Sequence, residues 1–161
     1  MSAAPELVQL LIERRLTIAV AESLTGGLLV AELIDTPGAS ATVLGGVVAY
    51  NTELKKTLLG VDTAILNVHG AVHPDVAAEM AVRVREVCAV GGVPADVGVS
   101  TTGVAGPDPQ DGHPVGTVFI AVSVTGDVRV VPLTLRGDRE TIRRQVVEAA
   151  INETLARLSE N

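Results

Sequence analysis

A short apolar segment that ends in a polar, glycine-rich turn constrains the fold of this chain more than any other feature. Residues 16–21 have the composition of a buried strand. The turn Glu-Ser-Leu-Thr-Gly-Gly follows at 22–27, and a helix is predicted over 25–35, so that it begins within this turn. Backbone N–H groups at a helix start carry partial positive charge, so a phosphate, a carboxylate or a developing oxyanion is favoured there. The same turn is also compatible with Ser23 as a helix N-cap and with glycines that only permit close packing.

The rest of the pattern predicts alternating helices and strands. Helices are expected over 5–15, 25–35, 51–60, 74–90 and 138–158, and strands over 16–21, 42–50, 96–102, 116–124 and 128–135. Asn51 and Asp138 are expected to cap the helices that they begin. A turn at 125–127 joins the last two strands as a hairpin, so the sheet contains an antiparallel pair. We therefore expect one domain over residues 1–161, a three-layer α/β/α sandwich with a mixed, partly antiparallel sheet. Ligands of such sheets bind beyond the strand ends, where loops converge.

Composition and charge narrow the partners of the chain. The formal net charge is −7, and there are one Tyr, one Phe and no Trp, so phosphates would be repelled and bases would find little to stack on. Every apolar run is broken before it reaches membrane-spanning length, and no secretory signal is apparent. The single Cys88 has no disulfide partner and is expected to be a core thiol. The sequence predicts a cytoplasmic protein that binds neither nucleic acid nor membrane.

Several familiar functional motifs are absent. The chain has no Gly-x-x-x-x-Gly-Lys phosphate loop, no Gly-x-Gly-x-x-Gly after a strand and no Gly-x-Ser-x-Gly elbow. His69 and His73 are four residues apart, but Gly70 and Pro74 place them in a turn, and no further Cys or His completes a metal set. His113 lies in a glycine- and proline-rich loop and has no triad context. We expect neither a metal ion nor a cofactor.

Hydroxyl groups and cations gather at the predicted element ends. They are Ser23, Tyr50 and Thr102 after the first three strands, Lys55 on the short helix, and Arg136 and Arg139 before the last helix. A serine needs a base to become nucleophilic near neutral pH, and a lysine in a dry or apolar setting can serve, although Lys55 and Lys56 can equally be a solvated surface pair. Arg139 falls in the first helical turn, where the macrodipole disfavours a cation unless an anion binds nearby.

Six ordered motifs resemble the CinA C-terminal domain family over nearly the whole chain. They are residues 21–27, 46–51 together with Lys55, 69–72, 102–107, 114–118 and 137–139. The resemblance implies an enzyme that hydrolyses the carboxamide of nicotinamide mononucleotide without a metal, giving nicotinic acid mononucleotide and ammonia. Longer CinA proteins carry an additional N-terminal domain, so the chain resembles the stand-alone form of the family.

The resemblance also implies roles for particular residues. Ser23 becomes the nucleophile or the activator of a water molecule, Lys55 its base, and Arg139 a contact for the substrate anion; Tyr50 and Thr102 become hydroxyls of the site. Backbone N–H groups near Gly26 and Gly27 are expected to hold the oxyanion, and the backbone of residues 103–106 the phosphate. The full set of expected substrate-binding positions is Thr25, Gly26, Gly27, Gly46, Asn51, Thr102, Gly103, Gly106, Arg136 and Arg139.

Two departures from the family and two other functions stay open. Pro109-Gln110-Asp111-Gly112 replaces a common glycine pair, and His73 stands where the family often has a serine cap. The same residues would suit a nucleotide-binding module without turnover, or a regulatory partner of competence proteins. The apolar, aromatic-poor composition favours a homodimer or a higher homo-oligomer.

Overall fold

A five-stranded mixed sheet forms the centre of the protein. The computed structural model describes residues 1–160. The strands are β1 (Ile18–Glu22), β2 (Val43–Val48), β3 (Val97–Gly103), β4 (Thr117–Val124) and β5 (Asp127–Thr134), in the spatial order β2-β1-β3-β4-β5. Strand β1 pairs in parallel with β2 and β3, whereas β4 is antiparallel to β3 and to β5. The predicted mixed sheet with a terminal hairpin is confirmed.

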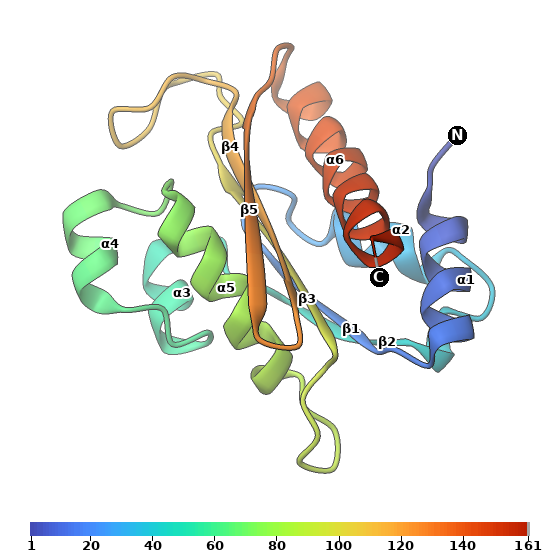
Figure 1. Cartoon of the computed structure of the whole chain (residues 1–161). Coiled ribbons are helices and arrows are strands. Elements are labelled where there is room, and N and C mark those ends of the chain that lie inside the picture. The colour runs from blue at the N-terminus through green and yellow to red at the C-terminus, as the bar shows by residue number, and fades with distance from the viewer. Residues whose placement is uncertain (161) are drawn as a thin grey trace.

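Helices cover both faces of the sheet (Figure 1). They are α1 (Ala4–Arg14), α2 (Leu28–Ile34), α3 (Thr52–Thr57), α4 (Thr63–His69), α5 (Pro74–Val87) and α6 (Arg139–Ser159), and a 3-10 helix, η1 (Ala39–Ala41), precedes β2. Figure 1 shows α1, α2 and α6 on one side of the sheet and α3, α4 and α5 on the other, which confirms the three-layer sandwich. No helix within residues 1–160 is long and apolar enough to cross a bilayer.

The larger apolar core lies between the sheet and the helices α1, α2 and α6. Leu7, Leu29 and Ile142, one from each helix, are fully or almost fully buried in the same cluster as Val99 and Ile120 of the sheet. Burying a side chain of this size contributes about 1.5–3 kcal/mol, so this layer holds the three helices against the sheet. The opposite face is covered mainly by α5, which packs against β3 and β4 and also against the small residues Ala19 and Ala21 of β1.

Polar side chains cap the start of four helices, among them Asp62 at α4. Asn51 accepts a hydrogen bond from the Glu53 amide at the start of α3 (2.9 Å), and Asp138 accepts one from the Thr141 amide at the start of α6 (2.8 Å). The predicted caps at Asn51 and Asp138 are confirmed. His73 caps α5 through Nδ1, which accepts from the Asp75 amide at 3.2 Å and so replaces a serine in its structural role.

Two helix boundaries and one whole helix differ from the prediction. Helix α2 begins at Leu28 and not at residue 25, because residues 24–27 form turns, and α5 ends at Val87 before a tight hairpin around Gly91 and Gly92. Helix α4 is not predicted at all. His69 is its last residue and not part of a turn, and its ring stacks on that of His73 at 3.9 Å.

Gly98 sets the distance between α5 and the sheet. A Cβ atom at this position would lie 1.9 Å from the carbonyl oxygen of Ala81 in α5, so a side chain cannot be placed without moving the helix backbone. This close approach sets the distance between the backbones of α5 and β3. The turn that precedes α5 contributes to the candidate site described below.

We expect Gly98→Ala to lower the free energy of unfolding by about 2–3 kcal/mol, because the added methyl group overpacks against main chain. Urea denaturation measures this change. Gly45→Ala is the matched control, since a Cβ there meets only the Cys88 sulfur at 4.0 Å. Its effect should stay below about 0.5 kcal/mol. Equal losses in the two variants would show that Gly98 does not set the packing of α5.

Candidate active site

A polar cavity of about 310 Å³ opens at the carboxyl ends of the three parallel strands. Ser23 follows β1, Tyr50 follows β2, and Thr102 lies near the end of β3, so the sheet topology brings the three hydroxyls to one edge. Eight of the predicted positions line the cavity, namely Ser23, Tyr50, Asn51, Lys55, Thr102, Gly103, Gly106 and Arg139. The structure thus gathers residues that are up to 116 positions apart in sequence, from Ser23 to Arg139.

Lys55 points from α3 into the protein and meets Ser23. The two functional atoms, Lys55 Nζ and Ser23 Oγ, are 2.8 Å apart, and Nζ also lies 2.7 Å from the carbonyl oxygen of Ala49 and 3.3 Å from that of Tyr50. The Lys55 side chain is fully buried, whereas Lys56 is exposed and pairs with Glu53. Lys55 is therefore not one half of a solvated surface pair.

Burial favours the neutral form of Lys55, which can accept a proton. Within residues 1–160 no carboxylate forms an ion pair with it, and burial lowers the pKa of Lys55 to about 8. A neutral amine has two N–H donors and one lone pair. Since the carbonyls of Ala49 and Tyr50 can only accept, they take the two N–H groups and leave the lone pair for the Ser23 hydroxyl proton.

The main chain of Ser23 is fixed by β3. The Ser23 amide donates to the carbonyl oxygen of Thr101 at 3.1 Å and lies 3.3 Å from the Thr101 hydroxyl. Thr25 is fully buried, and its hydroxyl lies 2.8 Å from that of Thr101. Residues 22–27 are called the nucleophile turn below, because they carry the candidate nucleophile Ser23. Thr25, a predicted substrate contact, faces the interior behind this turn and does not line the cavity.

The start of α2 is occupied by a carboxylate from the chain itself. The two oxygens of Glu22 accept hydrogen bonds from the amides of Leu29 (2.8 Å) and Val30 (3.1 Å), and the Glu22 side chain is fully buried. The expectation that this helix start receives a ligand anion is therefore corrected, because Glu22 satisfies its N–H groups. The sequence signal for this contact was a carboxylate, Glu22, at the end of a strand and seven residues before Leu29 of the following helix.

The two glycines of the nucleophile turn do not reach the cavity. The Gly26 amide donates to the carbonyl oxygen of Ser23 at 3.1 Å, and Gly27 is the N-cap residue of α2 with φ +102°. Neither glycine is part of the cavity lining. The positive φ of Gly27 explains why glycine is required at that position: a side chain would be strained.

Arg139 closes one side of the cavity. Its Nη1 donates to the carbonyl oxygen of Gly106 (2.6 Å), and its Nη2 donates to the hydroxyl of Tyr50 (2.9 Å). Within the described part of the chain, no carboxylate forms an ion pair with Arg139. Its charge, together with the remaining N–H groups, is available to an anion. Thr102 is buried, and its hydroxyl donates to the carbonyl oxygen of Ala71 at 2.7 Å.

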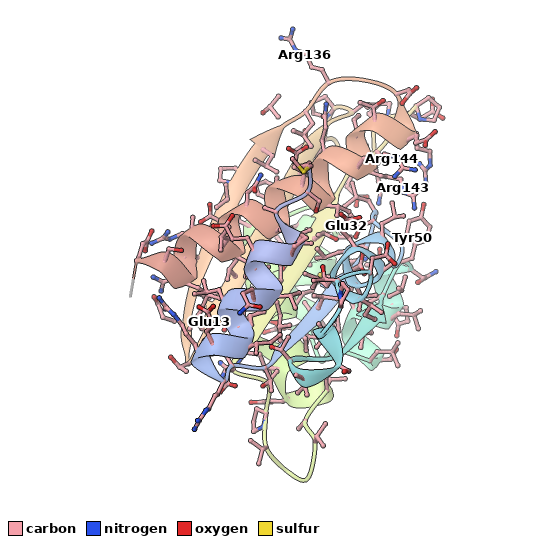
Figure 2. The ribbon with its side chains drawn as sticks, turned by 90° about the vertical axis from the view of Figure 1, so that its right-hand side faces the viewer. Glu13, Glu32, Tyr50, Arg136, Arg143 and Arg144 are labelled. Carbon is pink, nitrogen blue, oxygen red and sulfur yellow. The ribbon has the colours of Figure 1, made fainter. Side chains whose placement is uncertain are left out.

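Two predicted contacts lie away from the cavity. A Cβ atom at Gly46 would come within 2.9 Å of a methyl group of Val20 and 3.3 Å of Val30, so this glycine allows α2 to pack on the sheet. Arg136 is exposed on the turn before α6, and Figure 2 shows it pointing away from Tyr50. Proximity in sequence to Arg139 does not bring Arg136 to the site, because the helix begins between them.

Some residues at the site were not predicted. Arg143 lies one helical turn after Arg139, and its Nε and Nη2 donate to the carbonyl oxygens of Leu24 (2.8 Å) and Thr25 (3.2 Å). The spacing of four residues on a helix was a signal, since such residues share a face. Asp108 and Gln110 also line the cavity, from the loop that departs from the family pattern.

The tip of that loop contacts the turn between α4 and α5. The carboxylate of Asp111 lies 3.4 Å from the Ala71 amide, and Gln110 and His113 pair through their main chains. The loop is the gold segment that projects beyond the sheet in Figure 1. Within residues 1–160, no three His, Cys, Asp or Glu side chains gather as metal ligands.

The lowered pKa of Lys55 predicts a pH-dependent stability. Its folded value of about 8 lies below the unfolded value of 10.5, so between these pH values the unfolded chain binds more protons and stability rises with pH. Replacing Lys55 by methionine removes this dependence. The stability of Lys55→Met relative to the unmodified protein should be highest near pH 7 and fall by roughly 3 kcal/mol up to pH 10.5.

Urea unfolding at several pH values between 7 and 10.5 measures this difference. Lys56→Met is the matched control, because Lys56 is exposed, and its difference should be constant over the same range. A constant difference for Lys55→Met would mean that the buried amine titrates like an ordinary lysine.

Comparisons with known proteins agree with this architecture. Residues 1–158 match the family described as the CinA C-terminal domain. A CinA-like protein of Chlorobaculum tepidum is 45% identical over 162 residues, covering 96% of this chain and 37% of that protein, and one of Frankia casuarinae is 46% identical over 143 residues, covering 89% and 32%. The chain thus spans about a third of the length of these curated relatives.

Solved structures extend the match to the fold. A CinA superfamily protein of Klebsiella pneumoniae superposes with a TM-score of 0.90 at 31% identity, covering 98% of this chain and 99% of that one. A CinA superfamily protein of Escherichia coli gives a TM-score of 0.88 at 33% identity, covering 94% and 86%. Because sequence and fold match over nearly the whole chain, the protein belongs to the CinA C-terminal domain family.

Proposed function

We propose that the protein hydrolyses the carboxamide of nicotinamide mononucleotide to nicotinic acid mononucleotide and ammonia. The observation that carries the reaction type is the 2.8 Å contact between Ser23 Oγ and the buried Lys55 Nζ at the cavity. A serine with a neutral amine as base is suited to acyl transfer. The choice of substrate rests on the motifs that the site shares with the CinA C-terminal domain family.

The proposed reaction has two stages. Ser23 Oγ forms a bond to the carboxamide carbon while its proton passes to Lys55 Nζ. The C–N bond then breaks, Lys55 returns the proton to the leaving nitrogen, and ammonia departs. In the second stage a water molecule gives a proton to Lys55 and attacks the acyl carbon, the bond to Ser23 breaks, and the acid is released as Ser23 regains its proton.

Burial makes the proposed base effective near neutral pH. With a pKa of about 8, roughly a tenth of Lys55 is neutral at pH 7, whereas with the ordinary value of 10.5 only about 0.03% would be. The free-base fraction therefore rises by a factor of roughly 300. A module that only binds nucleotides gains nothing from a desolvated lysine held against a serine, and this favours turnover over simple binding.

The opposite side of the cavity is suited to the substrate phosphate. Arg139 occupies the first turn of α6, directly after the N-cap Asp138. Its two hydrogen-bond partners, the Gly106 carbonyl and the Tyr50 hydroxyl, are uncharged, so its positive charge is not neutralised by them. We assign the phosphate to Arg139 together with the neighbouring backbone of residues 103–106.

A direct assay tests the proposed function. The purified protein should release ammonia and nicotinic acid mononucleotide from nicotinamide mononucleotide with no added metal and without loss in EDTA. Ser23→Ala and Lys55→Met should each lower kcat by about a hundredfold or more, and the double variant should be no slower than the slower single one. Turnover that disappears in EDTA, or losses that multiply in the double variant, would contradict the Ser23–Lys55 mechanism.

A second experiment tests the assignment of the phosphate. Arg139→Ala should lower kcat/KM for nicotinamide mononucleotide by on the order of ten- to a hundredfold, because a charge-assisted contact is lost. The loss for nicotinamide riboside, which has no phosphate, should be much smaller. Arg136→Ala is the matched control and should leave both substrates unchanged, since that side chain points away from the site. Equal losses for the two substrates would remove Arg139 from the phosphate contact.

A further inference from the structure

We propose that the main-chain amide of Leu24 is a donor of the oxyanion hole of this site, and that Arg143 of α6 is the positioning residue that orients the turn carrying this amide. The inference rests on the proposed function, because attack by Ser23 on an amide creates an oxyanion that needs hydrogen-bond donors. It also replaces the expectation that Gly26 and Gly27 hold this charge.

Two buried amides beside the nucleophile lack an acceptor. Within residues 1–160, the N–H groups of Leu24 and Thr25 donate to no protein atom, although Leu24 is 3% exposed and Thr25 is fully buried. The amides of Ser23 and Gly26, on either side, are both bonded. A buried N–H group without an acceptor costs about 1–3 kcal/mol, so the Leu24 amide, which belongs to the cavity lining beside Ser23, points to a ligand.

Arg143 determines the direction of the Thr25 amide. A trans peptide group is planar, and its N–H and C=O bonds point in opposite directions. The Leu24 carbonyl belongs to the same peptide group as the Thr25 N–H and is bonded to Arg143 Nε at 2.8 Å. The Thr25 N–H therefore points away from α6. The cation on the carbonyl also polarises the peptide group and strengthens its N–H as a donor.

The next peptide group shows the same alignment. The Thr25 carbonyl accepts from Arg143 Nη2 at 3.2 Å, and the Gly26 N–H of that group points to the carbonyl oxygen of Ser23 at 3.1 Å. Arg143 thus binds two successive carbonyls with its planar fork, which a lysine cannot reproduce. The Ser23 carbonyl, which accepts from the Gly26 N–H, belongs to the same peptide group as the Leu24 N–H, so the Leu24 N–H points the opposite way. Arg143 thus orients the Leu24 amide through the Thr25–Gly26 peptide group.

Other donors near Ser23 are either bonded or away from the cavity. The amides of Leu29 and Val30 at the start of α2 are taken by Glu22, and none of Thr25, Gly26 and Gly27 lines the cavity. Leu24 does line the cavity. Its amide immediately follows the nucleophile, as one donor of the oxyanion hole does in α/β-hydrolases.

Variants of Arg143 and of its neighbour Arg144 distinguish loss of the orientation of the turn from a general loss of positive charge on α6. Arg143→Met removes the bonds to the Leu24 and Thr25 carbonyls, whereas Arg144→Met removes an exposed side chain that pairs only with Glu140 within the described residues. Figure 2 shows both arginines on α6. Far-UV circular dichroism and thermal unfolding check that each variant is folded, and Arg143→Lys serves if the methionine variant is not.

The first readout is turnover of nicotinamide mononucleotide. Because an oxyanion hole acts only in the transition state, Arg143→Met should lower kcat by about tenfold or more and change KM less than about threefold. Arg144→Met should leave both constants within about twofold. A loss confined to KM, or equal losses in the two variants, would overturn the positioning role of Arg143.

The second readout does not depend on the nucleotide substrate. A small alkyl fluorophosphonate phosphonylates a reactive serine: a bond forms between Ser23 Oγ and phosphorus, the P–F bond breaks, fluoride leaves and the proton passes to Lys55. Mass spectrometry follows the modification at Ser23. The rate of phosphonylation should fall by about tenfold in Arg143→Met and stay unchanged in Arg144→Met. The reason is that the phosphoryl oxygen of the probe accepts its hydrogen bond from the same oxyanion hole.

The two readouts distinguish the two proposals. If the unmodified protein does not turn over nicotinamide mononucleotide but Ser23 labelling slows in Arg143→Met, the proposed substrate is wrong and the oxyanion hole stands. If turnover is present and Arg143→Met is labelled at the unmodified rate, the oxyanion hole is overturned and the substrate stands. Absence of labelling in the unmodified protein overturns the oxyanion hole as well.

Discussion

The removal of one lysine amine from water is the constraint around which the site is built. Lys55 meets two main-chain carbonyls and one serine hydroxyl, and no carboxylate within residues 1–160 neutralises it. Both carbonyls come from the segment directly after β2, and Lys55 follows them in the last turn of α3. A few consecutive residues therefore desolvate the amine and orient it toward the end of β1. The burial that lowers the pKa of the lysine also destabilises the folded state at neutral pH, which is the kind of exchange expected at an active site.

The nucleophile turn is held from several directions at once. Glu22 connects the beginning of the turn to the first amides of α2, Thr101 of β3 binds the Ser23 main chain, and Arg143 of α6 binds two carbonyls. Each contact comes from a different element, so the turn keeps its shape only while β3, α2 and α6 remain packed together. A site that must stabilise charge within a fraction of an ångström needs this kind of support.

Local patterns predicted the elements, and long-range contacts decided what the residues do. Strand composition, the caps at Asn51 and Asp138, and hydroxyls at strand ends were enough to place Ser23, Tyr50 and Thr102 together, because carboxyl ends of parallel strands share one edge. Arg143 was not predicted, because its bond to the Leu24 carbonyl spans 119 positions, and its spacing of four residues from Arg139 indicates a shared helix face but not this partner. Helix α4 was missed because seven residues give too little periodicity to distinguish a helix from a loop. Gly46 and Arg136 were misplaced because only packing reveals which side of an element faces the cavity.

Arg139 and Arg143 of α6 are synthesised after the rest of the site, because α6 is the last helix of the chain. The proposed nucleophile and its proposed base, Ser23 and Lys55, both lie within the first 55 residues, whereas Arg139 and Arg143 lie near the end of the sequence. A growing chain that has reached the end of β3 contains Ser23 and Lys55 but has neither the cation beside Tyr50 nor the clamp on the Leu24 carbonyl. These contacts to the site form only when the last helix packs on the finished sheet. An unfinished or truncated polypeptide therefore holds its serine without the support that completes the site.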